Sequence, residues 1–112
     1  ARAYLSLYDG TGTAGIYRGF AQAGLLASYQ KCAHLGCRVP FCTTSGWFEC
    51  PCHGSRYNRA GEYQYGPAPA GLWHFPILID AGNVTLDTAQ PGAQAPRGTD
   101  TIRQQAEGPH CV

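Results

Sequence analysis

The chain has 112 residues, a length that supports one hydrophobic core and excludes two ordinary domains. Hydrophobic residues make up 44% and charged residues 13% of it, with 15 glycines, a composition that indicates a folded, loop-rich chain and excludes general disorder. The net charge is +1 and the basic residues are scattered, which excludes nucleic acid and anionic lipid as expected partners.

Six short segments have the alternating or aromatic-rich pattern of β-strands. In chain order they are residues 4–8, 25–29, 47–48, 62–65, 75–79 and 84–86. A loop rich in glycine and threonine is predicted over residues 9–15, and the turn-forming residues 80–83 predict a hairpin between the last two strands. No segment has a sustained helical period, so we expect an all-β fold, either an antiparallel β-sandwich or a small barrel.

The last part of the chain, residues 89–112, is rich in Gln, Pro, Gly and Ala. We expect it to lie as an extended tail over the surface of a single domain, residues 1–112. No stretch approaches the roughly 18 apolar residues of a membrane helix, and no signal-peptide pattern opens the chain, so the chain itself is expected to be soluble. Because it begins at Ala1 and contains no Met, we expect a processed or truncated piece whose membrane anchor lies in a segment absent from it.

Six cysteines in so short a chain indicate metal ligation, disulfides or both. Four of them lie in two motifs that also contain histidine, C-A-H-L-G-C at residues 32–37 and C-P-C-H-G-S at residues 50–55. A two-iron cluster needs four protein ligands, and two loops that each present a thiolate and an imidazole can supply two to each iron. The motifs therefore predict a 2Fe-2S cluster with mixed Cys and His ligation.

Two other kinds of site could use the same residues. A structural zinc site usually draws on Cys pairs two to four residues apart, which fits Cys-x-His followed by Cys-x-Cys-His poorly. A metal-free disulfide framework would leave the two histidines unexplained. The iron-sulfur interpretation accounts for both residue types.

The two motifs resemble those of the Rieske proteins of cytochrome bc and cytochrome bf complexes, and the resemblance covers about residues 31–69. It implies a Rieske-type β-sandwich or small barrels with a cluster-binding subdomain of two loops, at about residues 30–70. The implied ligands are Cys32 and Cys50 for one iron and His34 and His53 for the other.

The remaining cysteines of the motifs, Cys37 and Cys52, would form a disulfide between the two loops according to the same resemblance. Rieske ferredoxins and ring-hydroxylating oxygenases generally lack this second cysteine in each loop. The pair therefore favours the high-potential, quinol-oxidising branch and an oxidising compartment, the periplasm or the extracytoplasmic face of a membrane.

Four further residues receive roles from the resemblance. The hydroxyl groups of Ser55 and Tyr57 would donate hydrogen bonds to a bridging sulfide and to a ligand cysteine sulfur, which favours the reduced cluster. Leu35 would lie at the cluster tip and dock against a quinol pocket. Pro67, within residues 66–69, would belong to a proline loop that covers the cluster from a third side.

The function implied is that of a subunit of a quinol–cytochrome c or quinol–plastocyanin reductase. The protein would take an electron from quinol beside a cytochrome b-type subunit, accept a proton on His34 or His53, and pass the electron to a cytochrome haem. The 15 residues between His34 and Cys50 resemble the shorter cytochrome bf and Gram-positive type. The alternatives are the small Rieske subunit of a periplasmic oxidoreductase such as arsenite oxidase, and a Rieske ferredoxin.

Two cysteines remain once the ligands and the loop disulfide are assigned, Cys42 and Cys111. In an oxidising compartment they are expected to form a second disulfide that holds the tail beside the cluster loops, although two free or intermolecular thiols stay open. Closing a loop of some seventy residues would constrain the unfolded chain by about 4 kcal/mol in the chain-entropy model.

Three other groups of residues receive structural interpretations. His74 has no second ligand near it in sequence and is expected to be a surface or partly packed histidine. Arg38 is expected to be a solvated side chain. The aromatic residues expected in the core are Tyr4, Tyr8, Tyr17 and Trp47.

Overall fold

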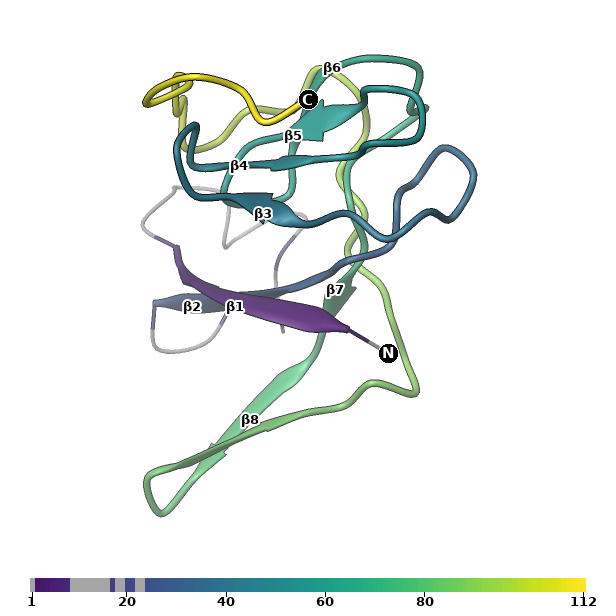
Figure 1. Ribbon diagram of the computed structural model, residues 1–112. Coiled ribbons are helices and arrows are strands. Elements are labelled where there is room, and N and C mark those ends of the chain that lie inside the picture. Colours follow the sequence, from purple (N-terminus) through teal and green to yellow (C-terminus); the bar gives the residue numbers. More distant parts are fainter. Residues whose placement is uncertain (1, 9–16, 18–19, 22–23) are drawn as a thin grey trace.

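The computed structural model describes residues 2–8, 17, 20–21 and 24–112, and its strands form three antiparallel sheets (Figure 1). The first sheet has the order β1-β2-β7, the second runs β3-β4-β5-β6, and the third is the hairpin β8-β9. The strand bounds are β1 (Ala3–Leu7), β2 (Leu25–Tyr29), β3 (Phe41–Cys42), β4 (Trp47–Glu49), β5 (Arg56–Tyr57), β6 (Tyr63–Tyr65), β7 (His74–Phe75), β8 (Ile77–Asp80) and β9 (Asn83–Leu86).

The all-β prediction is confirmed, because the described part of the chain contains strands and no helix. In that part there is accordingly no helix long and apolar enough to cross a membrane. The two-residue strands β3 and β5 were not predicted, and the loop predicted over residues 9–15 lies outside the described residues.

The strand predicted over residues 75–79 is two strands, β7 and β8, which belong to different sheets. Pro76 lies between them, and its missing backbone N–H interrupts the ladder. The predicted hairpin after it is present, with Asp80 opposite Asn83. Its two turn residues, Ala81 and Gly82, have φ values of 50° and 82°, as a two-residue turn of type I′ requires.

The core consists of three clusters of buried side chains. The one beneath the four-stranded sheet includes Phe48 and Tyr57, both fully buried. Tyr4 is only partly buried but packs against this cluster, stacked on Phe41 at 4.5 Å between ring centroids. Tyr8 and Tyr17 are buried in the second cluster, as expected.

The expectation of a core position for Trp47 is wrong. Side chains alternate between the two faces of a strand, and on β4 it is Phe48 that faces the core. Trp47 is half-buried on the other face, where its ring lies 5.3 Å from that of His110.

The expectation of a surface or partly packed His74 is also wrong, because the side chain is fully buried. Its two ring nitrogens each lie 2.7 Å from a backbone carbonyl oxygen, of Ala93 and of Ala60. Burial lowers the pKa of His74, and the two carbonyl contacts and the charge of Glu62 act in the opposite direction. His74 therefore joins the tail to the body as a structural residue.

The tail from residue 89 onward contains no named strand, and polar groups hold much of it to the body. Two buried carboxylates, Glu62 and Glu49, accept hydrogen bonds from its backbone. Glu62 accepts from the Thr101 amide at 2.8 Å and from the Thr101 hydroxyl at 2.6 Å. It also accepts from the hydroxyl of Tyr17, whose pKa is raised far above its usual range by burial and then by this carboxylate.

Candidate metal centre

The first motif forms a tight loop closed by its own backbone. The Cys32 amide donates to the Cys37 carbonyl at 2.7 Å, and the Gly36 amide donates to the Cys32 carbonyl at 2.9 Å. An isolated bridge between Lys31 and Arg38 marks its base. Gly36 has a φ of 81°, a conformation that costs little only for glycine. Arg38 is exposed, as expected.

The second motif forms a loop with the same closing bonds, between β4 and β5. The Cys50 amide donates to the Ser55 carbonyl at 2.8 Å, and the Gly54 amide donates to the Cys50 carbonyl at 3.1 Å. Gly54 has a φ of 82°. Each loop thus begins at a cysteine and turns at a glycine four residues later, and both lie on the same side of the molecule (Figure 1).

The structure contains the disulfide between the loops that the sequence predicts, Cys37–Cys52, and the second one, Cys42–Cys111. All six cysteines lie in the described residues, and Cys32 and Cys50 are the two that remain unpaired. Both are buried. The two free thiols are therefore the cysteines that the motif comparison gave as iron ligands.

The two free thiols lie beside each other. Burial raises the pKa of the Cys50 thiol and the neighbouring Cys32 thiol raises it further, while the Cys52 and His53 amides act in the opposite direction. The hydroxyl of Tyr57 lies 3.2 Å from the Cys32 sulfur and accepts from the Ala33 amide at 3.3 Å. Burial, followed by Cys32, raises the pKa of this tyrosine far above its usual range, so the Tyr57 hydroxyl stays protonated beside the thiol.

The two histidines of the motifs also meet. The ring centroids of His34 and His53 are 4.9 Å apart and the rings are perpendicular. The Nδ1 atom of His34 is buried and has no hydrogen-bond partner among the described residues. A buried imidazole nitrogen with no partner fits a metal ligand, since other buried polar atoms are normally paired. His53 is exposed and His34 is partly buried.

A third segment approaches the second loop from the side. The Ala68 amide donates to the Ser55 hydroxyl oxygen at 3.1 Å. A Cβ atom on Gly66 would lie 2.5 Å from the Ser55 Cα atom, so only glycine permits this approach. Pro67 follows and is exposed, and Leu35 at the tip of the first loop is 67% exposed.

Two residues that support this segment were not found by sequence analysis. The hydroxyl of Tyr63 donates to the Gly66 carbonyl at 2.6 Å, and the guanidinium of Arg97 donates to the same oxygen at 2.7 Å. The guanidinium also lies over the Tyr63 ring, 4.3 Å from its centroid. Arg97 is 31 residues from Gly66 in sequence, so no local pattern indicates the contact.

Comparison with known proteins identifies the family. The model of the Rieske [2Fe-2S] domain matches residues 10–76, more than half of the chain. The chain belongs to the Rieske family. It is a 2Fe-2S electron-transport protein, and the two loops, with two free thiols and two adjacent imidazoles, have the donor set of a Rieske centre.

Relatives of this Rieske domain include iron-sulfur subunits of cytochrome b6-f complexes. This chain is 48% identical over 66 residues to the cytochrome b6-f complex iron-sulfur subunit 1, chloroplastic, of Nicotiana tabacum. The aligned residues cover 56% of this chain and 29% of that protein. This chain is 54% identical over 59 residues to the corresponding chloroplastic subunit of Chlamydomonas reinhardtii, covering 51% and 28%. The aligned part is thus less than a third of the length of these relatives.

A solved Rieske structure is also similar. The plasma membrane Rieske protein PetC3 from Synechocystis PCC 6803 superimposes with a TM-score of 0.53 at 29% sequence identity, over 60% of this chain and 69% of that one. The Rieske fold of this chain is therefore supported by structure as well as by sequence.

One other group of sulfur atoms is close enough to be confused with the centre. The Cys37, Cys50 and Cys52 sulfurs lie within 4.8 Å of one another. Because Cys37 and Cys52 are paired, only Cys50 of this group has a thiolate to offer to iron.

Proposed function

We propose that Cys32 and Cys50 bind one iron of the cluster and that His34 and His53 bind the other. The observation that carries this is the pairing of like donors from different loops: the two free, buried thiols are neighbours, and the two imidazole rings are 4.9 Å apart. Two donors of each kind are what a Rieske centre requires.

We also propose that the protein serves a quinol-oxidising complex of the cytochrome b6-f type and delivers electrons to a cytochrome haem. The relatives named above are subunits of such complexes. When bound, the cluster supplies the one-electron acceptor. The quinol would approach the end of the molecule where His53, Leu35 and Pro67 are exposed.

His53 is the better placed of the two histidines to meet the quinol hydroxyl, because it is exposed whereas His34 is partly buried. Its imidazole would accept a hydrogen bond from that hydroxyl and then its proton, so that quinol loses one proton and one electron together. The apolar Leu35 and Pro67 would keep water away from this contact.

Ser55 and Tyr57 would raise the reduction potential. The Tyr57 hydroxyl already lies at hydrogen-bond distance from the Cys32 sulfur. The Ser55 hydroxyl oxygen accepts from the Ala68 amide, which leaves its hydrogen for a sulfide of the cluster. Donors to sulfur stabilise the reduced, more negative cluster.

The two disulfides favour an oxidising compartment on the outer side of a membrane. Membrane association would come from a partner or from a segment outside this chain.

The test is electron paramagnetic resonance of the reduced protein together with redox titration at several pH values. We expect the Rieske spectrum and a midpoint potential toward the upper end of the range of about −150 to +300 mV. At alkaline pH the potential should fall by up to about 59 mV per pH unit for each proton taken up on reduction. A potential near the bottom of the range that does not change with pH would support a ferredoxin-like carrier and contradict quinol oxidation.

A further inference from the structure

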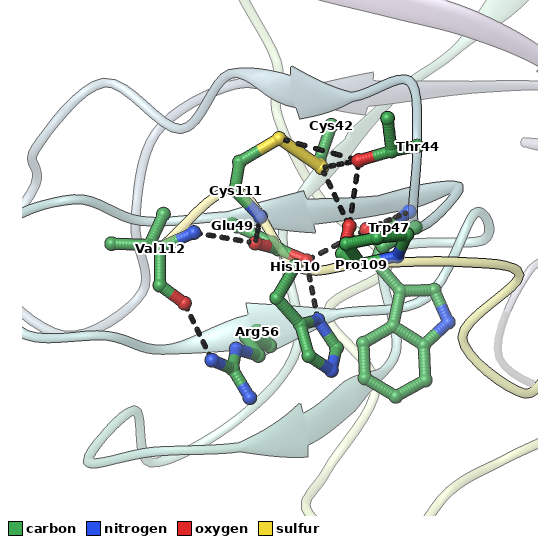
Figure 2. The surroundings of a disulfide bond; sticks show 10 residues. Cys42, Thr44, Trp47, Glu49, Arg56, Pro109, His110, Cys111 and Val112 are labelled. Carbon is green, nitrogen blue, oxygen red and sulfur yellow. Dashed lines mark hydrogen bonds and ion pairs between the residues drawn. A yellow bond between two sulfur atoms is a disulfide. The ribbon is translucent and has the colours of Figure 1, made fainter.

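The outer face of the four-stranded sheet is covered by the last three residues of the sequence, residues 110–112. Phe48 and Tyr57 point from β4 and β5 into the core, so their neighbours Glu49 and Arg56 point to the opposite face. Figure 2 shows residues 110–112 lying across this face, beside Cys42 of β3, Glu49 of β4 and Arg56 of β5.

Glu49 is the centre of these contacts. Its carboxylate is fully buried and accepts from the amides of Cys111 and Val112 at 2.6 and 3.1 Å. The His110 ring lies 2.7 Å from it, and the Ser45 hydroxyl donates at 2.7 Å. The Glu49 carboxylate therefore has partners in the turn before β4 and in residues 110–112 at the same time.

Contacts on both sides of Glu49 extend the attachment to the neighbouring strands. The Cys42–Cys111 disulfide fixes the segment to β3 across 69 residues of sequence. The Arg56 guanidinium donates to the Val112 carbonyl at 2.5 Å, which attaches the segment to β5. Residues 110–112 thus bind three adjacent strands at once.

The positions of Glu49 and Arg56 make this attachment relevant to the cluster. They are paired directly across β4 and β5, and the second loop, residues 50–55, begins after one and ends before the other. That loop contains Cys50 and His53, two of the proposed ligands. Whatever holds the two stem residues at a fixed separation also limits how far this loop can open.

We propose that residues 110–112, acting through Glu49 and Arg56, are positioning residues for the second cluster loop. The proposal rests on the ligand assignment of the proposed function. The hydrogen bonds of the Glu49 carboxylate go to Ser45 and to residues 110–112 rather than to a proposed ligand. Glu49 therefore acts through the strand that leads to Cys50 and through the segment it binds.

The alternative role for the same contacts is general stabilisation of the tail. The chain offers a matched control, because Glu62 is a second buried carboxylate that binds the tail, through Thr101. Glu62 is not a stem of either loop. Thr101→Val removes one of its hydrogen bonds and should lower stability without changing the cluster.

The test compares the wild-type holoprotein with Glu49→Gln, with the double variant Cys42→Ser/Cys111→Ser, and with Thr101→Val. The readouts are the paramagnetic resonance spectrum, the midpoint potential and hydrogen exchange of peptides spanning residues 32–37 and 50–55. His110→Ala, which keeps the disulfide, is the milder variant if either of the first two fails to fold.

We expect Glu49→Gln and the double cysteine variant to shift the spectrum and the potential. Exchange of the 50–55 peptide should become about tenfold faster, equivalent to about 1.4 kcal/mol of local stability, with the 32–37 peptide less affected. Thr101→Val should change neither loop selectively.

Equal acceleration of both loops, or lowered melting temperatures with unchanged spectrum and potential, would overturn the positioning role. Absence of a Rieske spectrum from the wild-type protein would instead contradict the ligand assignment, so the two failures are distinguishable.

Discussion

The two cluster loops have the same backbone closure and different support. In each loop the amide of the first cysteine donates a hydrogen bond to the carbonyl five residues later. The amide of a glycine with positive φ donates back to the carbonyl of that cysteine. The residues that flank the first loop, Lys31 and Arg38, pair in an isolated β-bridge. The second loop connects β4 and β5, two adjacent strands of the four-stranded sheet.

Outside contacts increase this difference. The first loop is supported by the Tyr57 hydroxyl near the Cys32 sulfur. The second receives the Ala68 amide on Ser55 and, through its stem residue Glu49, the segment 110–112. A repeated motif thus forms the same local structure twice, while contacts from elsewhere in the chain support the two copies differently. The Cys37–Cys52 disulfide links the first loop covalently to the second.

Loss of either proposed histidine ligand should have the largest effect, and the effect should be the same for both loops. His34→Ala and His53→Ala should each leave one iron without an imidazole and abolish the Rieske spectrum, because the assignment needs one histidine from each loop. The measurement is paramagnetic resonance of the reduced protein together with iron content. A normal spectrum from either variant would remove that histidine from the ligand set.

Cutting the bond between the loops should separate them. Cys37→Ser/Cys52→Ser removes a disulfide that closes 15 residues, worth about 3 kcal/mol in the chain-entropy model. We expect a lower free energy of unfolding, and faster hydrogen exchange at Gly36 than at Gly54, since the second loop keeps its sheet. If both amides respond equally, the two loops have the same support.

The two proposed hydroxyl donors, Ser55 and Tyr57, both come from the second loop and from β5, which follows it. Ser55→Ala and Tyr57→Phe should each keep the cluster and lower its potential by several tens of millivolts. A hydrogen bond to a charged group is worth about 1.5 to 3 kcal/mol, and about 1.4 kcal/mol corresponds to 59 mV for one electron. Tyr63→Phe is the control, since its hydroxyl binds the Gly66 carbonyl instead. An unchanged or raised potential would mean that the two hydroxyls do not donate to sulfur.

Substitution of the positive-φ glycine in each loop should have the smallest effect. Gly36→Ala and Gly54→Ala place a Cβ atom on residues with φ values of 81° and 82°, which should cost roughly 1 to 2 kcal/mol each. Space alone does not forbid either change: the nearest described atom at Gly36 is the flexible Lys31 Cε at 3.3 Å, and none lies within 4 Å at Gly54. Thermal or denaturant unfolding of both variants measures the cost, and clearly unequal values would show that the loops are not strained alike.

Local motifs made much of the centre predictable. The two Cys and His clusters lie within six residues each, and their residue types and spacing indicated iron-sulfur ligation, while the family resemblance divided them into four ligands and one disulfide. The Cys42–Cys111 pair could be predicted because no other cysteine remained. Strands of five residues such as β2 were found by their pattern, whereas β3 and β5, with two residues each, are too short to have one.

Long-range partners explain what could not be predicted. His74 is buried because carbonyl groups 14 and 19 residues away reach its ring. Glu49 and Glu62 belong to a residue type that is normally exposed, and their burial depends on tail amides 39 to 63 residues away. Neither the residue types nor the adjacent residues in sequence indicate that these three side chains are buried.

The attachment of the tail through its main chain has an evolutionary consequence. Glu49 accepts hydrogen bonds from the backbone amides of Cys111 and Val112, and Glu62 accepts one from the amide of Thr101. Every residue except proline has such an amide hydrogen. Many substitutions in the tail would therefore keep these hydrogen bonds, so its sequence can diverge while its path over the body is preserved. The family match ends at residue 76, yet residues 110–112 still reach the sheet that carries the second cluster loop. In other proteins of this architecture, a tail with the same path should be recognised by buried carboxylates at the positions of Glu49 and Glu62 rather than by its own sequence.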